Sequence, residues 1–424
     1  MRPTTKAEAM MLARAALVTL VVSTVIVAPS GIVGSTITQA RPALAQRTLT
    51  FGAPISLTGA TSAEGKLALD GYKLWAREVN DRGGFRAGKV IYRVVLKYYD
   101  DGSNPTRSAQ LTRKLVRSDK VNFLLGPYGT TATLADEVVA EHNHVPMVEG
   151  TGASAAIFSR NYRYIFGVIS LAPKYGKVML RAALGMPGPP HTLAIIYASD
   201  AFSRDVAAAA RVYALRHGMK VVLYREYPAG ATTLTQLMTE VKTARPDMLL
   251  GSGHATETIA AMKEARGLGI QAKLFAFTVG PTTPGFIKDL GRDADDVISS
   301  VQWTAEERFQ GIDIFRTPKH YARIFESVYG RPPAYQAAAA TAAGLAFQFA
   351  IKRAGDINRQ HVRNALAGLT IPTFFGPIRF DSRGANSSKS MAVIQIQNGH
   401  MVTVYPPGVG NGMMVYPTPP FGHR

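Results

Sequence analysis

Hydrophobic and polar positions near the start of the chain follow two periods in turn. Apolar side chains take alternate positions in residues 49–55 and again in residues 90–98, which is the spacing of a half-buried β-strand. Between these segments, residues 66–80 place apolar side chains on one side of a helix. Residues 107–118 continue with helical spacing and residues 121–125 form a short apolar run. The chain therefore opens with strands and helices in alternation.

A second series with the same alternation begins near residue 193. It reaches residue 278 and is similar in size to the first. We expect strands at residues 193–197, 220–227, 248–250 and 273–278, and helices at residues 203–217, 234–244 and 256–266. Alternating strands and helices predict parallel sheets that are covered by helices on both faces.

The last third of the chain has a different pattern. Residues 317–368 are mostly helical, and the uncharged run from residue 334 to 351 indicates a buried helix because it is rich in alanine and contains glutamine. Strands follow at residues 375–380, 391–397 and 401–405, and the Asn398-Gly399 pair between the last two is a strong hairpin signal. Residues 406–424 are rich in proline and glycine, and we expect them to be disordered.

Length and composition suit a two-lobed globular protein. At 424 residues the chain exceeds the size of one ordinary core, and its composition is 46% hydrophobic and 18% charged. The net charge of +19 makes a nucleic-acid partner a hypothesis to consider. We expect no nucleic-acid partner, because the basic residues are scattered and no run of five or more occurs.

The N-terminal residues 1–46 have the pattern of an export signal. A positively charged start precedes an uncharged, mostly apolar run at residues 15–28, and small residues at 43–45 offer a cleavage site. A retained anchor stays an alternative, since the apolar run extends to Val33 if polar residues are tolerated. The chain has no cysteine, which excludes disulfides, thiolate catalysis and a lipid attached through cysteine. We therefore expect a periplasmic protein without a lipid anchor.

Two neighbouring loops are the clearest candidates for a binding site. After the strand at residues 121–125, Gly126 and Pro127 break the chain, and Tyr128, Gly129 and Thr130 lead into a helix. The start of a helix has unpaired N–H groups and a partial positive charge, so it suits a carboxylate.

The second loop follows the apolar run at residues 145–148. It contains Thr151, Gly152, Ala153 and Ser154, whose small side chains allow a ligand to approach the backbone. Loops at the carboxyl ends of neighbouring strands are where open α/β sheets bind ligands. An ordinary helix cap at Thr130 and a plain flexible turn at residues 151–154 are the alternatives without a ligand.

Several local motifs together resemble one known family. They are GAPISLTG at residues 52–59, VNDRGG at 79–84, YDD at 99–101, LGP at 125–127 with VP at 145–146, and GPIRFDSRG at 376–384. In this order and spacing the chain resembles the periplasmic solute-binding proteins of branched-chain amino-acid ABC transporters, with the leucine-binding-protein-like type I fold. The resemblance covers roughly residues 48–405.

The resemblance implies two Rossmann-like lobes with parallel sheets flanked by helices, hinged by three crossovers around a ligand cleft. Lobe one would comprise residues 48–167 and 303–373, and lobe two residues 168–302 and 374–405. The protein would be a monomer that binds an amino acid or a similar small carboxylate and delivers it to the permease subunits of the membrane. A ligand that touches both lobes stabilises their closed arrangement.

The resemblance also implies ligand contacts from lobe two. Phe202 falls where relatives often place an aromatic side chain over the ligand, although it could equally pack on lobe two. Gly253 and His254 follow the strand at residues 248–250. The adjoining Gly251-Ser252-Gly253 is only part of a dinucleotide-binding loop, because the third glycine is missing.

Thr278 departs from the pattern of the amino-acid-binding relatives. They often carry an acidic residue near this position to pair with the ligand's ammonium group, and threonine has no such charge. Glu64 or Glu149 could supply it, and a solvated carboxylate is the alternative for each. If neither does, an amide or an aromatic acid becomes the expected ligand.

No motif indicates an enzyme, a cofactor or a metal. The chain lacks a His-Glu-x-x-His helix, a phosphate-binding P-loop, a Gly-x-Ser-x-Gly elbow and a complete dinucleotide fingerprint. His142 and His144 are two residues apart and so would not share a helix face. A sensor module that reports its ligand to a partner receptor would have the same fold, so that reading stays open beside the transport receptor.

Overall fold

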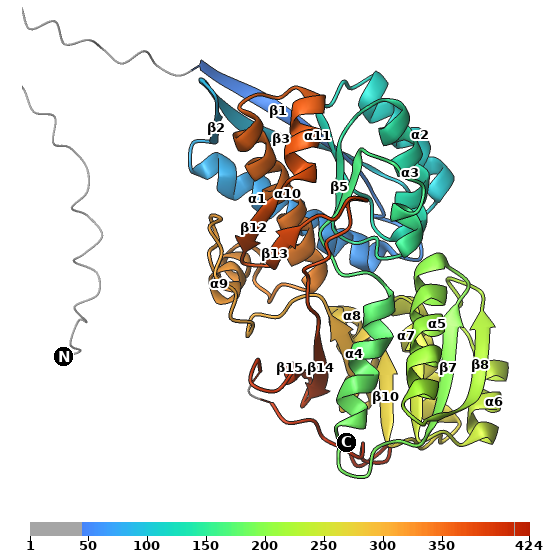
Figure 1. The fold of residues 1–424 in the computed structure, drawn as a ribbon. Helices are drawn as coiled ribbons and strands as arrows, with labels where there is room; N and C mark the ends of the chain where they lie inside the picture. Colours follow the sequence, from blue (N-terminus) through green and yellow to red (C-terminus); the bar gives the residue numbers. More distant parts are fainter. Residues whose placement is uncertain (1–44, 411) are drawn as a thin grey trace, which may run out of the picture. The chain divides into compact units, whose positions relative to one another are not determined.

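The computed structural model describes residues 45–410 and 412–424 (Figure 1). The predicted export signal therefore lies outside the described residues, except that Ala45 and Gln46 begin the first strand. Within the described part of the chain, no helix has both the length and the apolar character needed to cross a membrane.

Lobe one is built on a six-stranded sheet with the order β2-β3-β1-β4-β5-β6. β1 pairs in parallel with β3 along its whole length and with β4, and only β2 is antiparallel. The strands are β1 (Ala45–Ile55), β2 (Phe85–Ala87), β3 (Val90–Asp100), β4 (Phe123–Leu125), β5 (Met147–Glu149) and β6 (Ile165–Gly167). The alternation seen in residues 49–55 places Leu49, Phe51 and Ile55 in the core with no exposed surface.

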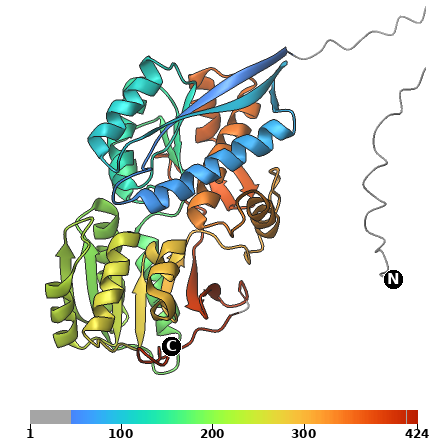
Figure 2. The same cartoon turned by 180° about the vertical axis from the view of Figure 1, so that it is seen from behind.

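Among the described residues, five α-helices form the body of lobe one, and a sixth, α9 (Pro318–Tyr329), is joined to it by hydrogen bonds between Tyr321 and Thr341 and from Tyr329 to Asp70. The five are α1 (Ser62–Asp81), α2 (Pro105–Arg117), α3 (Thr130–His142), α10 (Tyr335–Ala354) and α11 (Arg359–Ala367). The alanine-rich α10 is buried along nearly its whole length, as the run of uncharged residues predicts. α1, the blue helix in Figure 2, packs against it.

Lobe two is built on a seven-stranded sheet with the order β15-β14-β11-β10-β9-β7-β8. The strands are β7 (Thr192–Ala198), β8 (Lys220–Tyr227), β9 (Met248–Ser252), β10 (Leu274–Phe277), β11 (Ile298–Val301), β14 (Ala392–Gln397) and β15 (His400–Tyr405). The first five run parallel, and β14 and β15 are antiparallel. The helices are α4 (Pro173–Leu184), α5 (Ala201–Arg216), α6 (Thr235–Ala244), α7 (Ala255–Gly267) and α8 (Pro284–Leu290). The predicted α/β class is confirmed.

The hairpin between β14 and β15 is also confirmed. Asn398 and Gly399 have φ angles of 51° and 73°, which are the left-handed values that a two-residue hairpin turn needs.

The third crossover lies later in the chain than the boundary at residue 373 that the sequence suggested. β12 (Thr370–Thr373) and β13 (Gly376–Arg379) pair with each other as a small antiparallel sheet. Gly167 of lobe one then forms a bridge with Ala385. Residues 376–386 therefore stay with lobe one, because pairing to β12 and β6 holds them there.

Hydrogen bonds tie the three crossovers to one another. Ser170 N–H donates to the Gln302 side-chain oxygen at 2.9 Å, and Gln302 Nε2 donates back to the Ser170 carbonyl at 3.0 Å. The Ser170 hydroxyl donates to the Lys389 carbonyl at 2.6 Å. One residue from each crossover thus meets at a single buried point.

The C-terminal tail packs against lobe two, whereas its composition led us to expect disorder. Val415 N–H donates to Gln395 Oε1 and Thr418 N–H donates to the Lys273 carbonyl, both at 2.8 Å. The Arg424 guanidinium stacks over Phe421 at 4.0 Å. Proline and glycine limit regular structure, but they do not prevent an extended segment from using acceptors on a sheet.

The contact between α1 and α10 depends on glycine. A Cβ atom on Gly71 would lie 2.1 Å from the Ala337 carbonyl oxygen, and one on Gly344 would lie 2.2 Å from the Trp75 ring. Real atoms do not approach this closely, so a side chain at either position would force the helices apart.

Gly71→Ala should therefore lower the free energy of unfolding by about 1–3 kcal/mol, although alanine favours helix. The matched control is Gly285→Ala in α8, where a Cβ would meet nothing within 4 Å. Chemical denaturation followed by circular dichroism measures both variants. Equal stabilities for the two would contradict the close packing of α1 on α10.

Candidate functional site

A cavity of about 210 Å³ has walls from both lobes. Its lobe-one wall contains Ser56, Ser103 and residues 128–132, which follow β1, β3 and β4. Its lobe-two wall contains residues that follow β7, β8 and β9, among them Asp200 and His254. Both walls are therefore made by loops at the carboxyl ends of parallel strands, where α/β sheets bind ligands.

The first turn of α3 supplies free backbone donors to this cavity. Gly129 precedes the helix with a φ of 80°, and no side chain caps the helix start. Among the described residues, the N–H groups of Thr130, Thr131 and Ala132 have no acceptor, and all three residues line the cavity. Unpaired N–H groups at the positive end of a helix are suited to an anion.

The Thr130 hydroxyl has a structural task. Its oxygen accepts hydrogen bonds from the N–H groups of Ala153 and Ser154, each at 3.2 Å. Thr130 thus holds the second loop with its side-chain oxygen, and its backbone N–H and its hydroxyl hydrogen remain as donors.

Glu149 braces the first half of the same loop. Its Oε2 accepts from the N–H groups of Thr151 at 2.6 Å and Gly152 at 2.5 Å. Burial raises the pKa of this carboxyl to about 8, against the opposing effect of the two N–H donors. The amides of residues 151–154 are therefore held by the protein's own oxygens. The second oxygen of Glu149, Oε1, is buried and has no hydrogen-bond partner among the described residues.

Side chains of the second loop also have partners. Thr151 Oγ1 accepts from Gly129 N–H at 3.1 Å and donates to the Pro127 carbonyl at 2.8 Å. A Cβ on Gly152 would lie 2.8 Å from both Ile157 Cδ1 and Thr133 Oγ1. A large residue at position 152 would therefore disturb lobe one itself and is no clean test of ligand binding.

His254 connects the two lobes beside the cavity. Its Nδ1 lies 3.3 Å from the Tyr128 hydroxyl, and its Nε2 lies 3.9 Å from Asp200 Oδ2. Burial acts to lower the pKa of His254, but the carboxylates of Asp200, Glu257 and Glu64 outweigh it and the pKa is raised. Tyr128, Gly129, Thr130 and His254 are the predicted residues that line the cavity.

Glu64 also reaches across from lobe one. It is fully buried, and its Oε1 accepts from Ala255 N–H at the start of α7 at 2.8 Å. Its Oε2 has no hydrogen-bond partner among the described residues. Burial raises the pKa of this carboxyl, while His254 lowers it. Glu64 thus joins the lobes and lies outside the lining of the cavity.

Three further predicted residues lie within lobe two. Thr278 Oγ1 accepts from Gly253 N–H at 3.0 Å and donates to the Gly253 carbonyl at 2.9 Å. The Thr278 hydroxyl and both backbone polar groups of Gly253 therefore already have partners within the protein. Phe202 packs edge-on against Tyr175 at 5.1 Å and lies 5.9 Å from His254. None of the three lines the cavity.

The acidic residues of lobe two were not among the expected ligand contacts. Asp200 caps α5, since its Oδ1 accepts from Ser203 N–H at 2.9 Å. Glu257 Oε1 accepts from Gly230 N–H at 2.7 Å, and its Oε2 accepts from His254 N–H at 3.2 Å. The sequence did carry a signal, because Asp200 stands three residues before Ser203 in the manner of an N-cap. That signal predicts the start of a helix, but it does not predict that Asp200 faces lobe one across the cavity.

Asp205 also links the two lobes by hydrogen bonds, at a point outside the cavity lining. The Ser154 hydroxyl donates to Asp205 Oδ2 at 2.6 Å, and Ala155 N–H donates to the same oxygen at 3.2 Å. Ser154 belongs to lobe one and Asp205 to α5 of lobe two.

Two α/β lobes, three crossovers and an interlobe cavity define a two-lobed solute receptor of the type I periplasmic binding fold. The chain belongs to the periplasmic binding protein family, whose sequence pattern matches residues 48–400. Members of this family are receptors that bind solutes without catalysis, so the chain is a solute-binding protein and no enzyme.

Known proteins of this kind resemble the chain along most of its length. The chain is 21% identical to Leu/Ile/Val-binding protein homolog 7 of Brucella abortus, over 84% of this chain and 89% of that protein. It is similar in fold to the leucine-binding protein LivK of Thermotoga maritima, with a TM-score of 0.74, 19% identity and coverage of 84% and 97%. A benzoate-bound solute-binding protein of R. palustris gives a TM-score of 0.72 at 17% identity, with coverage of 84% and 96%.

The hydrogen bonds to Asp205 allow the closed arrangement of the lobes to be tested without a ligand. Asp205→Ala removes the acceptor of two hydrogen bonds, and we expect the open arrangement to gain population. Small-angle X-ray scattering of the ligand-free protein should show a larger radius of gyration than for the wild type. Asp205→Asn keeps one acceptor oxygen and is the matched control, with a smaller change. A scattering curve of Asp205→Ala identical to that of the wild type would contradict a role for these hydrogen bonds in closure of the lobes.

Proposed function

We propose that this protein is a periplasmic receptor of an ABC importer that binds a small α-amino acid in the interlobe cavity. One observation carries the proposal. Free N–H groups at the start of α3 line one wall of the cavity, and acidic side chains of the other lobe line the opposite wall. A zwitterion has a negative group for the first wall and a positive group for the second. The permease subunits of the membrane would then receive the solute from the closed form.

The charges of the cavity favour this class of ligand. Among the described residues that line it, Asp200, Glu257, His254 and Tyr128 are the ionisable ones, and none is a lysine or an arginine. A ligand carboxylate would thus be held by backbone N–H groups, and an ammonium group by the side that carries carboxylates. Ser56, Ser103 and Thr131 add hydroxyl groups, so the cavity suits a polar ligand better than a large apolar one.

The ligands named for similar proteins are consistent with the carboxylate end. They are leucine for the LivK protein, isoleucine for LivJ of Streptococcus pneumoniae and benzoate for the R. palustris protein. All of these molecules carry a carboxylate, but only two carry an ammonium group. An aromatic acid is therefore the second candidate, and Phe202 beside His254 is the feature that favours it. A sensor module would bind the same solutes, and its membrane partner would distinguish it from the importer.

A thermal-shift screen of the mature protein against free amino acids, their amides, their deaminated analogues and benzoate should identify the class. At 100 to 1,000 times its dissociation constant, a true ligand stabilises by about 3–4 kcal/mol. We expect an amino acid to stabilise the protein and both its amide and its deaminated analogue to be weaker. Stabilisation by benzoate alone would overturn the assignment of an amino acid as the ligand. Chemical turnover of any of these compounds would overturn the assignment of the protein as a receptor.

The anion site itself is tested by Thr131→Asp. An acidic residue in the first turn of a helix stabilises it by about 0.3–1 kcal/mol, so the fold should be kept. The new carboxylate would compete with the ligand carboxylate, and affinity should fall at least about tenfold by calorimetry.

The control is Thr235→Asp, which adds the same charge to the first turn of α6, where residue 235 is exposed and away from the cavity. It should leave solute affinity within about twofold of the wild type. Loss of affinity in both variants to the same degree would count against a carboxylate at the start of α3.

A further inference from the structure

One carboxylate of lobe one is buried at the start of a helix of lobe two. Glu64 lies in the first turn of α1, and its Oε1 accepts from the N–H group of Ala255, the first residue of α7, at 2.8 Å. Beside this bond, the Thr256 hydroxyl donates to the Ala60 carbonyl at 3.2 Å. Glu64 has no exposed surface, and Ala255 is only 4% exposed. The contact is thus sealed from water while the lobes are together.

The start of α7 provides what a carboxylate needs. The N–H groups of a first helical turn have no acceptor within the helix, and the peptide dipoles give that end a partial positive charge. The start of α3 presents the same feature to the solute cavity, but at α7 the protein supplies the carboxylate itself. Because Glu64 and Ala255 belong to different lobes, closing makes this bond and opening breaks it. Glu64 is therefore placed to favour the closed arrangement without a solute.

The second carboxylate oxygen makes this contact sensitive to protonation. Glu64 Oε2 is buried and has no hydrogen-bond partner among the described residues. A buried charge with an unpaired oxygen is costly, and a proton on the carboxyl removes the charge. In the open arrangement water would solvate the same oxygen. Closing the lobes thus favours the protonated carboxyl of Glu64, and opening favours the ionised one.

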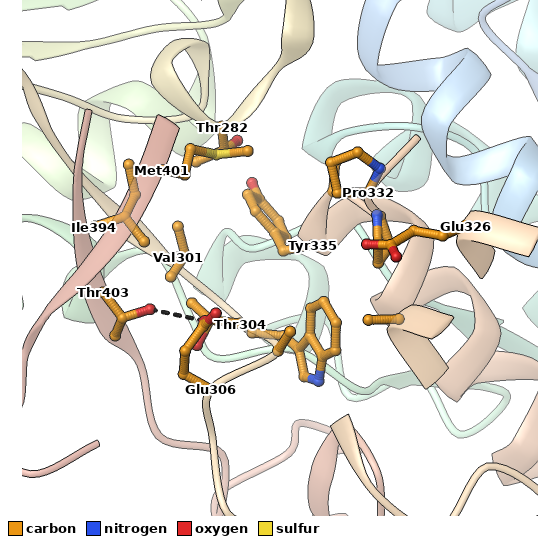
Figure 3. A pocket seen from close by; sticks show the side chains of 15 residues that line it. Thr282, Val301, Thr304, Glu306, Glu326, Pro332, Tyr335, Ile394, Met401 and Thr403 are labelled. Carbon is orange, nitrogen blue, oxygen red and sulfur yellow. Dashed lines mark hydrogen bonds between the residues drawn. The ribbon is translucent and has the colours of Figure 1, made fainter. Parts of the chain in front are cut away.

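The ionisable groups around Glu64 offer almost no positive charge. Among those in the described residues, only His254, the N-cap of α7, can become a cation. Figure 3 labels another of them, Tyr335, whose hydroxyl points toward Thr282 of lobe two. From the segments packed around Glu64 the remaining groups are Glu257 of α7, Tyr128 before α3, Tyr335 at the start of α10, Tyr175 of α4 beside Tyr335, and Asp200 before α5, which faces His254.

The carboxyl and the histidine shift in the same direction. Burial raises the pKa of Glu64 above its ordinary value of 4.5, although His254 and the Ala255 N–H group lower it. The pKa of His254 is also raised above its ordinary value of 6.5. Burial acts to lower this second pKa, but the carboxylates of Asp200, Glu257 and Glu64 outweigh burial.

The direction of both shifts gives the sign of the pH dependence. When the open lobes expose the two groups to water, each pKa returns toward its ordinary value, so the closed arrangement binds protons more tightly. Its gain in stability is complete below the ordinary pKa of each group and is lost as the pH rises through the raised pKa. For His254 this loss begins at about pH 6.5.

We propose that Glu64 is a positioning residue that couples closure of the lobes to the uptake of a proton. It acts through the start of α7 and touches no solute, since it lies outside the lining of the solute cavity. The ligand-free protein closes as the pH falls and opens as the pH rises. A solute that favours the closed arrangement is therefore bound more tightly at acid pH, because solute and proton stabilise the same state.

Small-angle X-ray scattering of the ligand-free mature protein measures closure from about pH 5 to about pH 9. We expect the radius of gyration of the wild type to rise with pH. Glu64→Gln keeps a side-chain oxygen for the Ala255 N–H group, but it does not titrate and it leaves one carboxylate fewer beside His254. Both changes reduce the number of protons taken up on closing, so the rise should be less than about half that of the wild type.

Two further variants separate the bond from the proton. Glu64→Ala removes the acceptor of the Ala255 N–H group, so it should be more open than Glu64→Gln at acid pH. The matched control Glu78→Gln removes a carboxylate that pairs with Arg82 of the same helix α1, and it should keep the full pH response. Circular dichroism at each pH checks that every variant is folded.

Three results would overturn the proposal. They are a wild-type radius of gyration that does not change with pH, a full pH response in Glu64→Gln, and equal radii for Glu64→Ala and Glu64→Gln at acid pH. A pH response that persists in Glu64→Gln would assign it to other groups, whereas a merely structural bond would show no pH response at all.

No solute takes part in this experiment, so its outcome is distinct from that of the proposed function. If the pH response depends on Glu64 while no amino acid stabilises the protein, this role of Glu64 stands and only the proposed ligand fails. If an amino acid binds but the radius of gyration does not change with pH, the proposed function stands and the role of Glu64 fails.

Discussion

The site depends on where the backbone N–H groups of two adjacent loops find acceptors. The loop after β5 is buried, and its amides need partners because an unpaired buried N–H group is costly. Glu149 and the Thr130 hydroxyl accept from all four amides of residues 151–154. Both acceptors are the protein's own, so this loop is complete without a ligand. The first turn of α3, held in place by the same bonds, keeps its own N–H groups free for an anion.

The sequence predicts only part of this arrangement, in which one loop has all its amides bonded and the neighbouring helix start keeps its N–H groups free. The strand-turn-helix pattern at residues 121–139 gave the helix start at Thr130, and local periodicity gave the order of most strands and helices. The hairpin at Asn398 and Gly399 was also readable, because its turn depends on two adjacent residues. Each of these features is set by neighbours in the sequence.

Features that depend on distant partners could not be predicted in the same way. Ala255 N–H bonds to Glu64, and His254 lies against Tyr128, across 191 and 126 residues respectively. Thr278 and Gly253 bond to each other across 25 residues, which removes both from the cavity. The tail is similar, since its order comes from Gln395 and Lys273 and nothing in its own composition reveals them.

The crossovers between the lobes are linked through side-chain contacts to the interlobe cavity. Ser170, Gln302 and Lys389 join the three crossovers at one buried point, and Gln302 Nε2 also donates to the Tyr175 hydroxyl at 2.9 Å. Tyr175 packs edge-on against Phe202, which in turn lies beside His254 at the solute cavity. Trp303, the next residue after Gln302, is buried and donates from its ring N–H to the Phe374 carbonyl of lobe one at 3.2 Å. A change in the angle between the lobes must therefore alter the interlobe cavity, and a solute that contacts both lobes favours the angle at which both walls reach it.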